Sequence, residues 1–105
     1  MSENTESDNI ELHDRILAFV RDELANATER GELTATTPLL EAGILDSLRT
    51  ARLIAWLRDD LGVRIPPLAM TGKNFHNIDR ITDLVASLRT TALTRAIELG
   101  KEPAR

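Results

Sequence analysis

A serine at the junction of a loop and a helix is the residue of this sequence best placed for chemistry. Ser47 lies within residues 43–48 (GILDSL), where loop sequence gives way to a helical pattern. Its hydroxyl is expected to stand exposed at the helix N-terminus, beside backbone N–H groups that have no partner within the helix. A phosphodiester placed there would meet the positive end of the helix dipole. The simpler interpretation is that Asp46 and Ser47 only cap the helix.

Other residue types that support catalysis are absent or poorly spaced. The chain has no cysteine, which excludes a disulfide scaffold, thiolate metal sites and a cysteine nucleophile. His13 and His76 fall on different predicted elements without a repeated ligand spacing, so we expect surface histidines and no metal site. The pair Asp59-Asp60 follows Arg58 at the end of a helix and is expected to form a solvated face rather than a carboxylate dyad.

The sequence also lacks the common catalytic signatures. It contains no G-x-S-x-G motif and no glycine-rich phosphate loop. No general base lies within the motif around Ser47, which disfavours a small hydrolase that uses this serine. We therefore expect that the protein is not an enzyme and has no catalytic residues of its own.

The first half of the chain predicts one helix and a long loop. The helix is expected from about Asp8, with Glu11 completing a capping pair, to a stop at Gly31. Its apolar stripe consists of Ile16, Leu17, Val20, Leu24 and Ala27, with Leu12 and Phe19 at the edge. Residues 31–46 contain breakers and no sustained helical period, so they form a loop. Four of its residues are nevertheless expected to be buried: Leu39, Leu40, Ile44 and Leu45.

The second half predicts three more helical elements. A second helix begins at Asp46 or Ser47 and ends at Gly62, and residues 63–65 are extended before Pro66. A single helical turn follows from Pro67 to about Thr71. The last helix runs from a cap at Asn77 to about Leu99. The buried faces of the two long helices are Thr50, Leu53, Ile54, Leu57 and Leu61, and Ile78, Ile81, Val85, Leu88 and Ala92. The sequence therefore predicts an all-α bundle of three longer helices and one short third helix.

Length and composition agree with one small domain. The chain has 105 residues, of which 42% are hydrophobic and 29% charged. We expect a domain over residues 9–99 between disordered tails at 1–8 and 100–105. No apolar run approaches a membrane span, and the polar start shows no signal peptide, so a monomeric, cytoplasmic protein without a membrane partner is expected.

The net charge conceals two halves of opposite sign. Residues 1–46 hold 11 acidic and 3 basic residues, and residues 47–105 hold 6 acidic and 10 basic residues. The halves carry −8 and +4, which together give the net charge of −4. The overall sign argues against general binding of nucleic acid, and the asymmetry predicts two differently charged faces.

The wider sequence around Ser47 resembles a known family. Residues 37–48 (TPLLEAGILDSL) resemble the phosphopantetheine attachment region of acyl and peptidyl carrier proteins. The downstream order also matches that family, through Leu61-Gly62-Val63, Ile65-Pro66, Asn74-Phe75 and Ile78-Asp79-Arg80-Ile81. The resemblance covers roughly residues 10–90.

This resemblance implies a fold, a cofactor and a set of partners. The fold is a four-helix acyl-carrier bundle in which Ser47, preceded by the motif residue Asp46, receives 4′-phosphopantetheine from coenzyme A. A separate phosphopantetheinyl transferase makes the attachment. The thiol of the arm then holds an acyl or aminoacyl group as a thioester, so that the missing cysteine is replaced by a sulfur on the cofactor. The implied later partners are an adenylating acyl or aminoacyl ligase and downstream enzymes that use the acyl group.

The second helix is expected to carry a docking surface. Projected at about 100° per residue, it turns Leu48, Arg52 and Ala55 away from the core. Arg49 and Trp56 flank them, so Leu48, Arg49, Arg52 and Trp56 are the predicted partner-binding residues. The alternative is that Leu48 is a tolerated surface leucine and that Trp56 packs on the loop.

The charges of this helix bear on the pathway. Fatty-acid carriers typically have an acidic second helix, whereas this one has Arg49, Arg52 and Arg58 against Asp59 and Asp60. The difference favours a dedicated partner with an acidic or mixed surface. Exchanging Arg49 and Arg52 for glutamate is expected to weaken loading by the ligase while the fold stays intact.

Several readings of the function remain open. Freestanding carriers of this type occur in nonribosomal peptide, polyketide and aminoacyl-transfer systems, with a small amino acid or short acyl group as the first choice of cargo. A polyketide extender or a fatty acyl chain is the second choice, and no residue identifies the cargo. The alternatives are a fatty-acid-type acyl carrier and an unmodified helical interaction module that has lost the arm.

Overall fold

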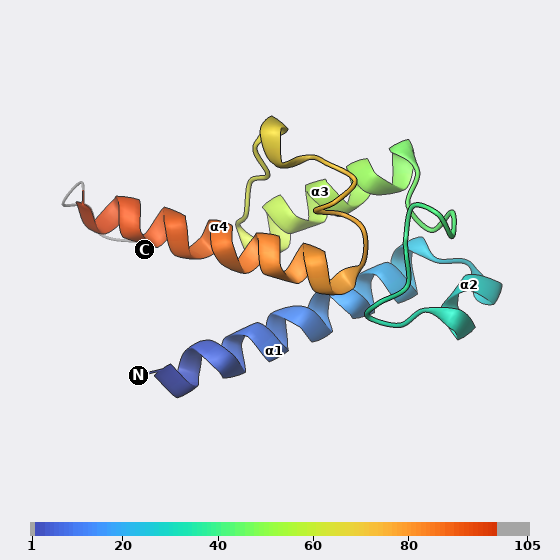
Figure 1. The fold of residues 1–105 in the computed structure, drawn as a ribbon, viewed down its shortest axis with the longest axis horizontal. Coiled ribbons are helices and arrows are strands. Elements are labelled where there is room, and N and C mark those ends of the chain that lie inside the picture. Colours follow the sequence, from blue (N-terminus) through green and yellow to red (C-terminus); the bar gives the residue numbers. More distant parts are fainter. Residues whose placement is uncertain (1, 99–105) are drawn as a thin grey trace.

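The chain folds into helices connected by one long and one medium loop. The computed structural model describes residues 2–98, with side chains described for residues 9–91, and no strand occurs in that range. The elements are α1 (Ser2–Phe19), a π-helical turn η1 (Val20–Leu24), α2 (Ala27–Glu32), α3 (Ser47–Leu61), a 3₁₀ turn η2 (Pro67–Ala69) and α4 (Ile78–Glu98) (Figure 1). The predicted all-α bundle is confirmed.

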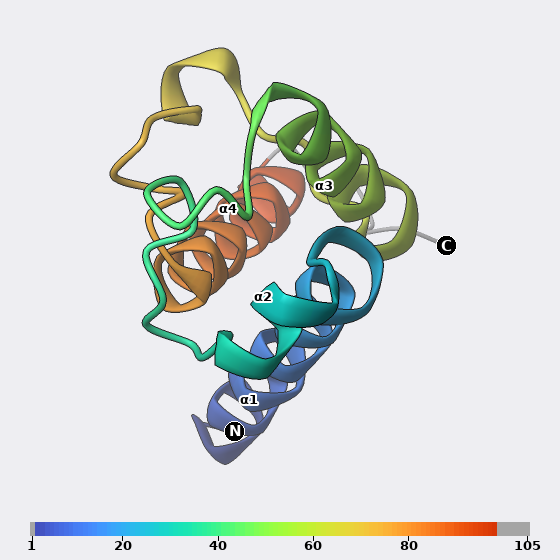
Figure 2. The same cartoon turned by 90° about the vertical axis from the view of Figure 1, so that its right-hand side faces the viewer.

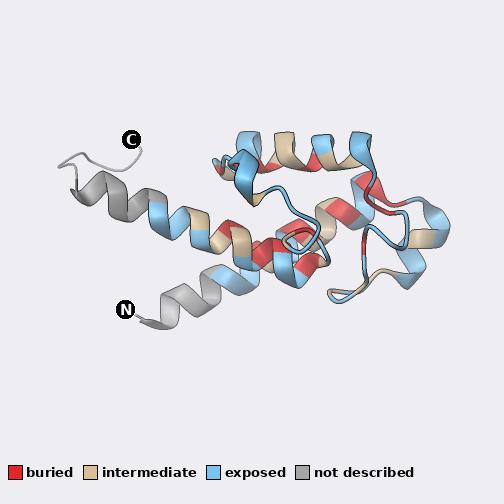
Figure 3. Ribbon diagram, turned by 45° about the horizontal axis from the view of Figure 1, so that its top comes forward, coloured by how far each residue is buried: buried red, intermediate tan, exposed pale blue. Residues whose placement is uncertain are grey.

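Figure 2 shows helices α1, α3 and α4 arranged as a bundle, and their buried side chains form one apolar core. Each helix turns one stripe of buried residues inward and leaves its outer face exposed (Figure 3). Fully buried side chains come from all three helices, among them Ile16, Leu53, Leu57, Ile81 and Val85. Burying each such side chain stabilises the fold by about 1.5–3 kcal/mol.

The predicted boundaries of α3 and the predicted start of α4 are confirmed. Asp46 caps α3, and Gly62 ends it in the left-handed region with φ 68°. The N–H groups of Gly62 and Val63 both donate to the Leu57 carbonyl, the second at 3.0 Å, and so satisfy a carbonyl of the last turn. Asn77 caps α4, because its side-chain oxygen accepts from the Arg80 N–H at 2.8 Å.

The predicted C-terminal end of the first helix, at Gly31, is wrong. The chain leaves the helix at Ala25, whose ψ is 144°, and a new helix, α2, starts after Asn26. Asn26 and Glu29 form a reciprocal capping box that begins α2, so Gly31 lies inside a helix and does not stop one. The break places both Leu24 and Ala25 in the core. Burial and capping together outweigh the continuous apolar stripe that the sequence suggests.

The predicted start of α1 is also too late. The helix begins at Ser2, six residues before the expected start at Asp8, and takes in most of the segment 1–8 that was expected to be a tail. This segment carries no apolar period from which a helix could be predicted. The predicted stop at Gly100 and the tail 100–105 lie outside the described residues.

The loop between α2 and α3 is tied to the start of α4. The Leu39 N–H donates to the His76 carbonyl at 2.8 Å, and the Asp79 N–H donates to the Ala35 carbonyl at 3.2 Å. As expected, Leu39, Ile44 and Leu45 are buried. The prediction for Leu40 is wrong, since its side chain is 44% exposed. Leu39 occupies the inward position, and the turn that begins there directs the next side chain to the surface.

Two glycines test this account of the helix ends. We expect Gly62→Ala to lower the free energy of unfolding by about 1 kcal/mol, because alanine is disfavoured in the left-handed region. Gly31→Ala is the matched control: an added Cβ meets nothing within 4 Å at either position, and Gly31 lies in a helix. It should raise stability by about 0.5 kcal/mol. Urea denaturation measures both, and equal effects at the two positions would contradict the assignment.

Candidate functional site

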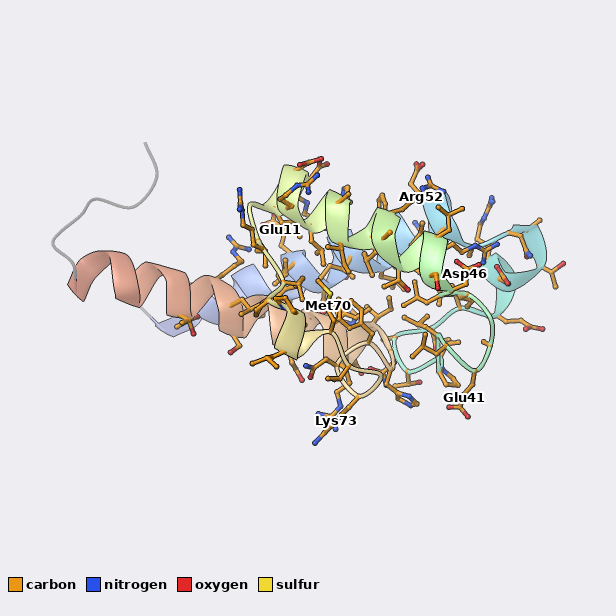
Figure 4. All side chains as sticks on the ribbon, turned by 90° about the horizontal axis from the view of Figure 1, so that it is seen from above. Glu11, Glu41, Asp46, Arg52, Met70 and Lys73 are labelled. Atoms are coloured by element: carbon orange, nitrogen blue, oxygen red, sulfur yellow. The ribbon has the colours of Figure 1, made fainter. Side chains whose placement is uncertain are left out.

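Ser47 is the first residue of α3, and its side chain is exposed. The residue before it fixes the helix start, because the Asp46 carboxylate accepts from the Arg49 N–H at 2.8 Å. The Asp46 carbonyl accepts from the Thr50 N–H at 2.8 Å and so begins the helical hydrogen-bond pattern. Figure 4 shows Asp46 at this end of α3, beside the loop that leads into it. The serine hydroxyl thus stands at the positive end of a capped helix of 15 residues, as predicted.

The Arg49 side chain is not free beside Ser47, although the helical projection places it at the edge of the predicted docking surface. Its Nη1 donates to Glu29 Oε1 at 3.1 Å, to the Gly43 carbonyl at 3.3 Å and to the Ile44 carbonyl at 3.2 Å. The side chains of the ion pair are only 26% (Arg49) and 20% (Glu29) exposed. These contacts argue against the expectation that Arg49→Glu leaves the fold intact, because the exchange would place a carboxylate against Glu29 and two carbonyl oxygens.

Glu29 takes part in two interactions with the same oxygen. Its Oε1 accepts from the Asn26 N–H at 2.8 Å as well as from Arg49, while its own N–H donates to Asn26 Oδ1 at 2.8 Å. The sequence could have revealed the first interaction, because Asn followed by Glu three residues later is a capping-box signature. The second joins residues 20 positions apart, and no spacing rule predicts it.

The outer side of α3 next to Ser47 is apolar apart from one cation. Leu48 is 72% exposed, and Arg52 lies exposed one turn further along (Figure 4). Within the described part of the chain, Arg52 makes no ion pair. Arg58 and Asp59 pair at 3.0 Å, and their hydrogen bond lowers the pKa of Asp59 and raises that of Arg58. Arg52 is therefore the charge that this stretch of α3 offers to a partner.

Trp56 packs against α1 and does not stand out as an exposed flank of this surface. Its ring stacks on Phe19, with centroids 4.5 Å apart and planes inclined by 11°. Both side chains are half-buried and pack against the core. The alternative that Trp56 packs on the loop is also wrong, since its partner belongs to the last turn of α1. The two residues lie far apart in the sequence, and no local pattern predicts that they stack.

The remaining polar candidates lie on different elements of the fold. His13 Nε2 lies 2.9 Å from Asp79 Oδ1 and links α1 to α4, while His76 is exposed. Asp59 and Asp60 are exposed at the end of α3, as expected for a solvated face. Among the described residues there is no group of three side chains that could hold a metal ion. None of the helices in that same range is long and apolar enough to cross a membrane.

The fold and the site together define a class of protein: a helical bundle that presents a serine at the N-terminus of its central helix. Residues 14–85 match the family model described as "Phosphopantetheine attachment site". The match spans more than half of the chain, and the chain belongs to this family of phosphopantetheine-binding carrier proteins. No curated protein was found to match it.

Membership of the family establishes the cofactor and the general type of partner. The domain carries covalently attached 4′-phosphopantetheine. Carrier domains of this kind are generally non-catalytic and interact with phosphopantetheinyl transferases and with enzymes that use the bound group.

The contacts of Arg49 predict a difference in stability between the two arginines nearest Ser47. Arg49→Ala should lower the free energy of unfolding by about 2 kcal/mol, since it removes hydrogen bonds from a charged donor and leaves Glu29 without its cation. Arg52→Ala, which removes an exposed cation from the same helix, should change it by less than about 0.5 kcal/mol. Chemical denaturation of the two variants checks this, and similar losses in both would contradict the observed role of Arg49.

Proposed function

We propose that Ser47 is the residue that bears the 4′-phosphopantetheine arm. The observation that carries the proposal is its exposed hydroxyl at the capped N-terminus of α3, within the matched region. Unpartnered backbone N–H groups of the first helical turn lie where a phosphodiester on this oxygen would need them. Ser87 offers a contrast, because it is exposed in the middle of α4, where backbone N–H groups already serve the helix. The geometry therefore suits the arm at Ser47 and not at Ser87.

The attachment is a group transfer in which this chain supplies the acceptor. The Ser47 oxygen forms a bond to the phosphorus of coenzyme A that bears pantetheine, and the phosphoanhydride bond of coenzyme A breaks. Adenosine bisphosphate leaves, and the hydroxyl proton passes to a base on the transferase. Asp46 is not assigned as this base, because its carboxylate already accepts from the Arg49 N–H. Its role is to hold the helix start beneath the serine.

The arm, when attached, supplies the thiol that this cysteine-free chain lacks. We assign no catalytic step to the protein itself. Its residues present the arm and are recognised by the successive enzymes that act on the thioester.

The face formed by Leu48 and Arg52 is the proposed docking surface. Leu48 offers an apolar side chain next to Ser47, and Arg52 offers an exposed cation, without an ion pair among the described residues, on the same side of α3. A partner with an apolar pocket and a nearby carboxylate would complement both. Arg49 and Trp56 contribute to this surface by holding α3 in place, since their side chains are engaged with Glu29 and Phe19.

The same face supports a specialised pathway over a standard fatty-acid system. A carrier whose docking helix presents an arginine near the modified serine, with its acidic pair Asp59-Asp60 at the far end, is suited to a dedicated partner. We propose an adenylating ligase that loads a small amino acid or a short acyl group, as in nonribosomal peptide, polyketide or aminoacyl-transfer pathways. Incubation of the armed protein with ligases of each class tests this: efficient loading by a fatty-acid system alone would overturn it.

The attachment site is tested by intact mass. Wild-type protein incubated with coenzyme A and a promiscuous phosphopantetheinyl transferase should gain the mass of one arm, and Ser47→Ala should gain none. Ser87→Ala is the matched control and should load fully, because it removes another exposed serine from a different helix. A wild-type protein that gains no mass under any condition would instead indicate an unmodified interaction module.

The docking surface is tested by loading kinetics. Leu48→Ala and Arg52→Glu should each lower kcat/KM of the cognate ligase by about 5- to 30-fold, because truncating a central contact removes about 1–2 kcal/mol of binding. The effect of Arg52→Glu should shrink at high salt. Ile10→Ala is the control, since Ile10 is 60% exposed on α1. Equal losses in Ile10→Ala and Leu48→Ala would exclude a specific surface on α3.

A further inference from the structure

The backbone that leads into Ser47 is held from two sides. On one side, a single nitrogen of Arg49 contacts the carbonyl oxygens of Gly43 and Ile44. On the other side, the N–H groups of Ile44 and Leu45 both donate to the Leu39 carbonyl, at 2.9 and 3.1 Å. Gly43 has φ 78°, a conformation that glycine adopts without strain. Because glycine has no side chain, no side-chain contact of Gly43 can hold this conformation. These four hydrogen bonds, together with the buried side chains of Ile44 and Leu45, hold the loop next to the serine.

Arg49 is in turn held by Glu29. The carboxylate belongs to α2, which has six residues and no buried side chain. So short a helix is marginal on its own, and none of its own side chains is buried. Its capping box and the ion pair with Arg49 are the interactions that hold Glu29 in this position. The two half-shielded charges thus connect α2, the loop and the first turn of α3.

We infer that Glu29 and Arg49 are positioning residues for attachment of the arm: they preorganise residues 43–46 so that a transferase meets Ser47 on an ordered backbone. The inference rests on the proposed function of Ser47. Neither residue takes part in the transfer itself, since both side chains are engaged with each other and with the loop.

The physical consequence is a specific change in kinetics. A loop that is ordered before binding has already lost its conformational freedom, whereas a loosened loop must lose it when the transferase binds. Once bound, the ordered loop presents the same hydroxyl in either case. Breaking the link between Glu29 and Arg49 should therefore raise KM for this protein and leave kcat nearly unchanged.

The test is steady-state arm transfer from coenzyme A by a promiscuous phosphopantetheinyl transferase, well below the melting temperature of every variant. Glu29→Gln keeps a side chain suited to the capping box but removes the charge, and it should raise KM by about 3- to 10-fold. Arg49→Met should raise it at least as much. Arg49→Lys should recover part of the loss, because one ammonium nitrogen has three N–H groups for the same three acceptors.

Gly62→Ala is the control for stability alone. It destabilises the other end of α3, far in sequence from Ser47, and should load with the KM of the wild type. An equal rise in KM for Gly62→Ala, or a change confined to kcat in the Glu29 and Arg49 variants, would overturn the inference. So would an unchanged KM in Glu29→Gln and Arg49→Met. If wild-type protein is not modified at Ser47 at all, the proposed function fails first.

A second measurement does not depend on the transferase. Amide hydrogen exchange at Ile44 and Leu45 reports directly on the hydrogen bonds to Leu39. Glu29→Gln should accelerate exchange at these two amides by about tenfold while the core helix positions Leu53 and Leu57 keep their protection. Unchanged exchange at Ile44 and Leu45 would contradict preorganisation, even if the Arg49 variants proved too unstable for kinetics.

Discussion

The hydrogen bonds at the start of α3 hold the backbone on which Ser47 stands, and the rest of the account depends on them. Asp46 satisfies a backbone N–H of the first turn, and Arg49 reaches back from that turn to two loop carbonyls and to Glu29. The loop that they hold has its own apolar anchors, Leu39, Ile44 and Leu45, in the core between the helices. A serine hydroxyl in the middle of a helix would lack free donors, and one on a loose loop would lack a fixed direction. Ser47 has both.

Two of the three arginines of α3 already form ion pairs within the chain. The sign of the chain changes between residues 46 and 47, yet the arginines that follow are not equivalent. Arg49 forms a partly buried ion pair with Glu29, and Arg58 pairs with its neighbour Asp59. Arg52 has no ion pair in the described region. Leu48 and Arg52 are therefore the exposed side chains next to Ser47 that form the proposed docking surface. A carrier must release each partner in turn, and so small a set of contacts suits repeated, transient binding.

The sequence revealed the features that rest on local rules. Asp46, Gly62 and Asn77 are strong boundary residues, and the structure has helix ends at each of them. The break at Ala25 was missed because the apolar stripe continues through it, although the capping signature of Asn26 and Glu29 was present. The inward turn of Arg49 and the stacking of Trp56 on Phe19 depend on contacts between distant segments. A helical wheel gives the direction of a side chain from the helix axis and cannot tell whether another element lies there.

The central claim is that this chain acts through an arm on Ser47. The most direct measurement is tandem mass spectrometry of the protein isolated from the cells that make it, because it reports the modified residue and the attached cargo together. The account predicts 4′-phosphopantetheine on the peptide that contains Ser47, with an acyl or aminoacyl group on part of the molecules. A Ser47 peptide that is wholly unmodified, or an arm found on another serine, would contradict it.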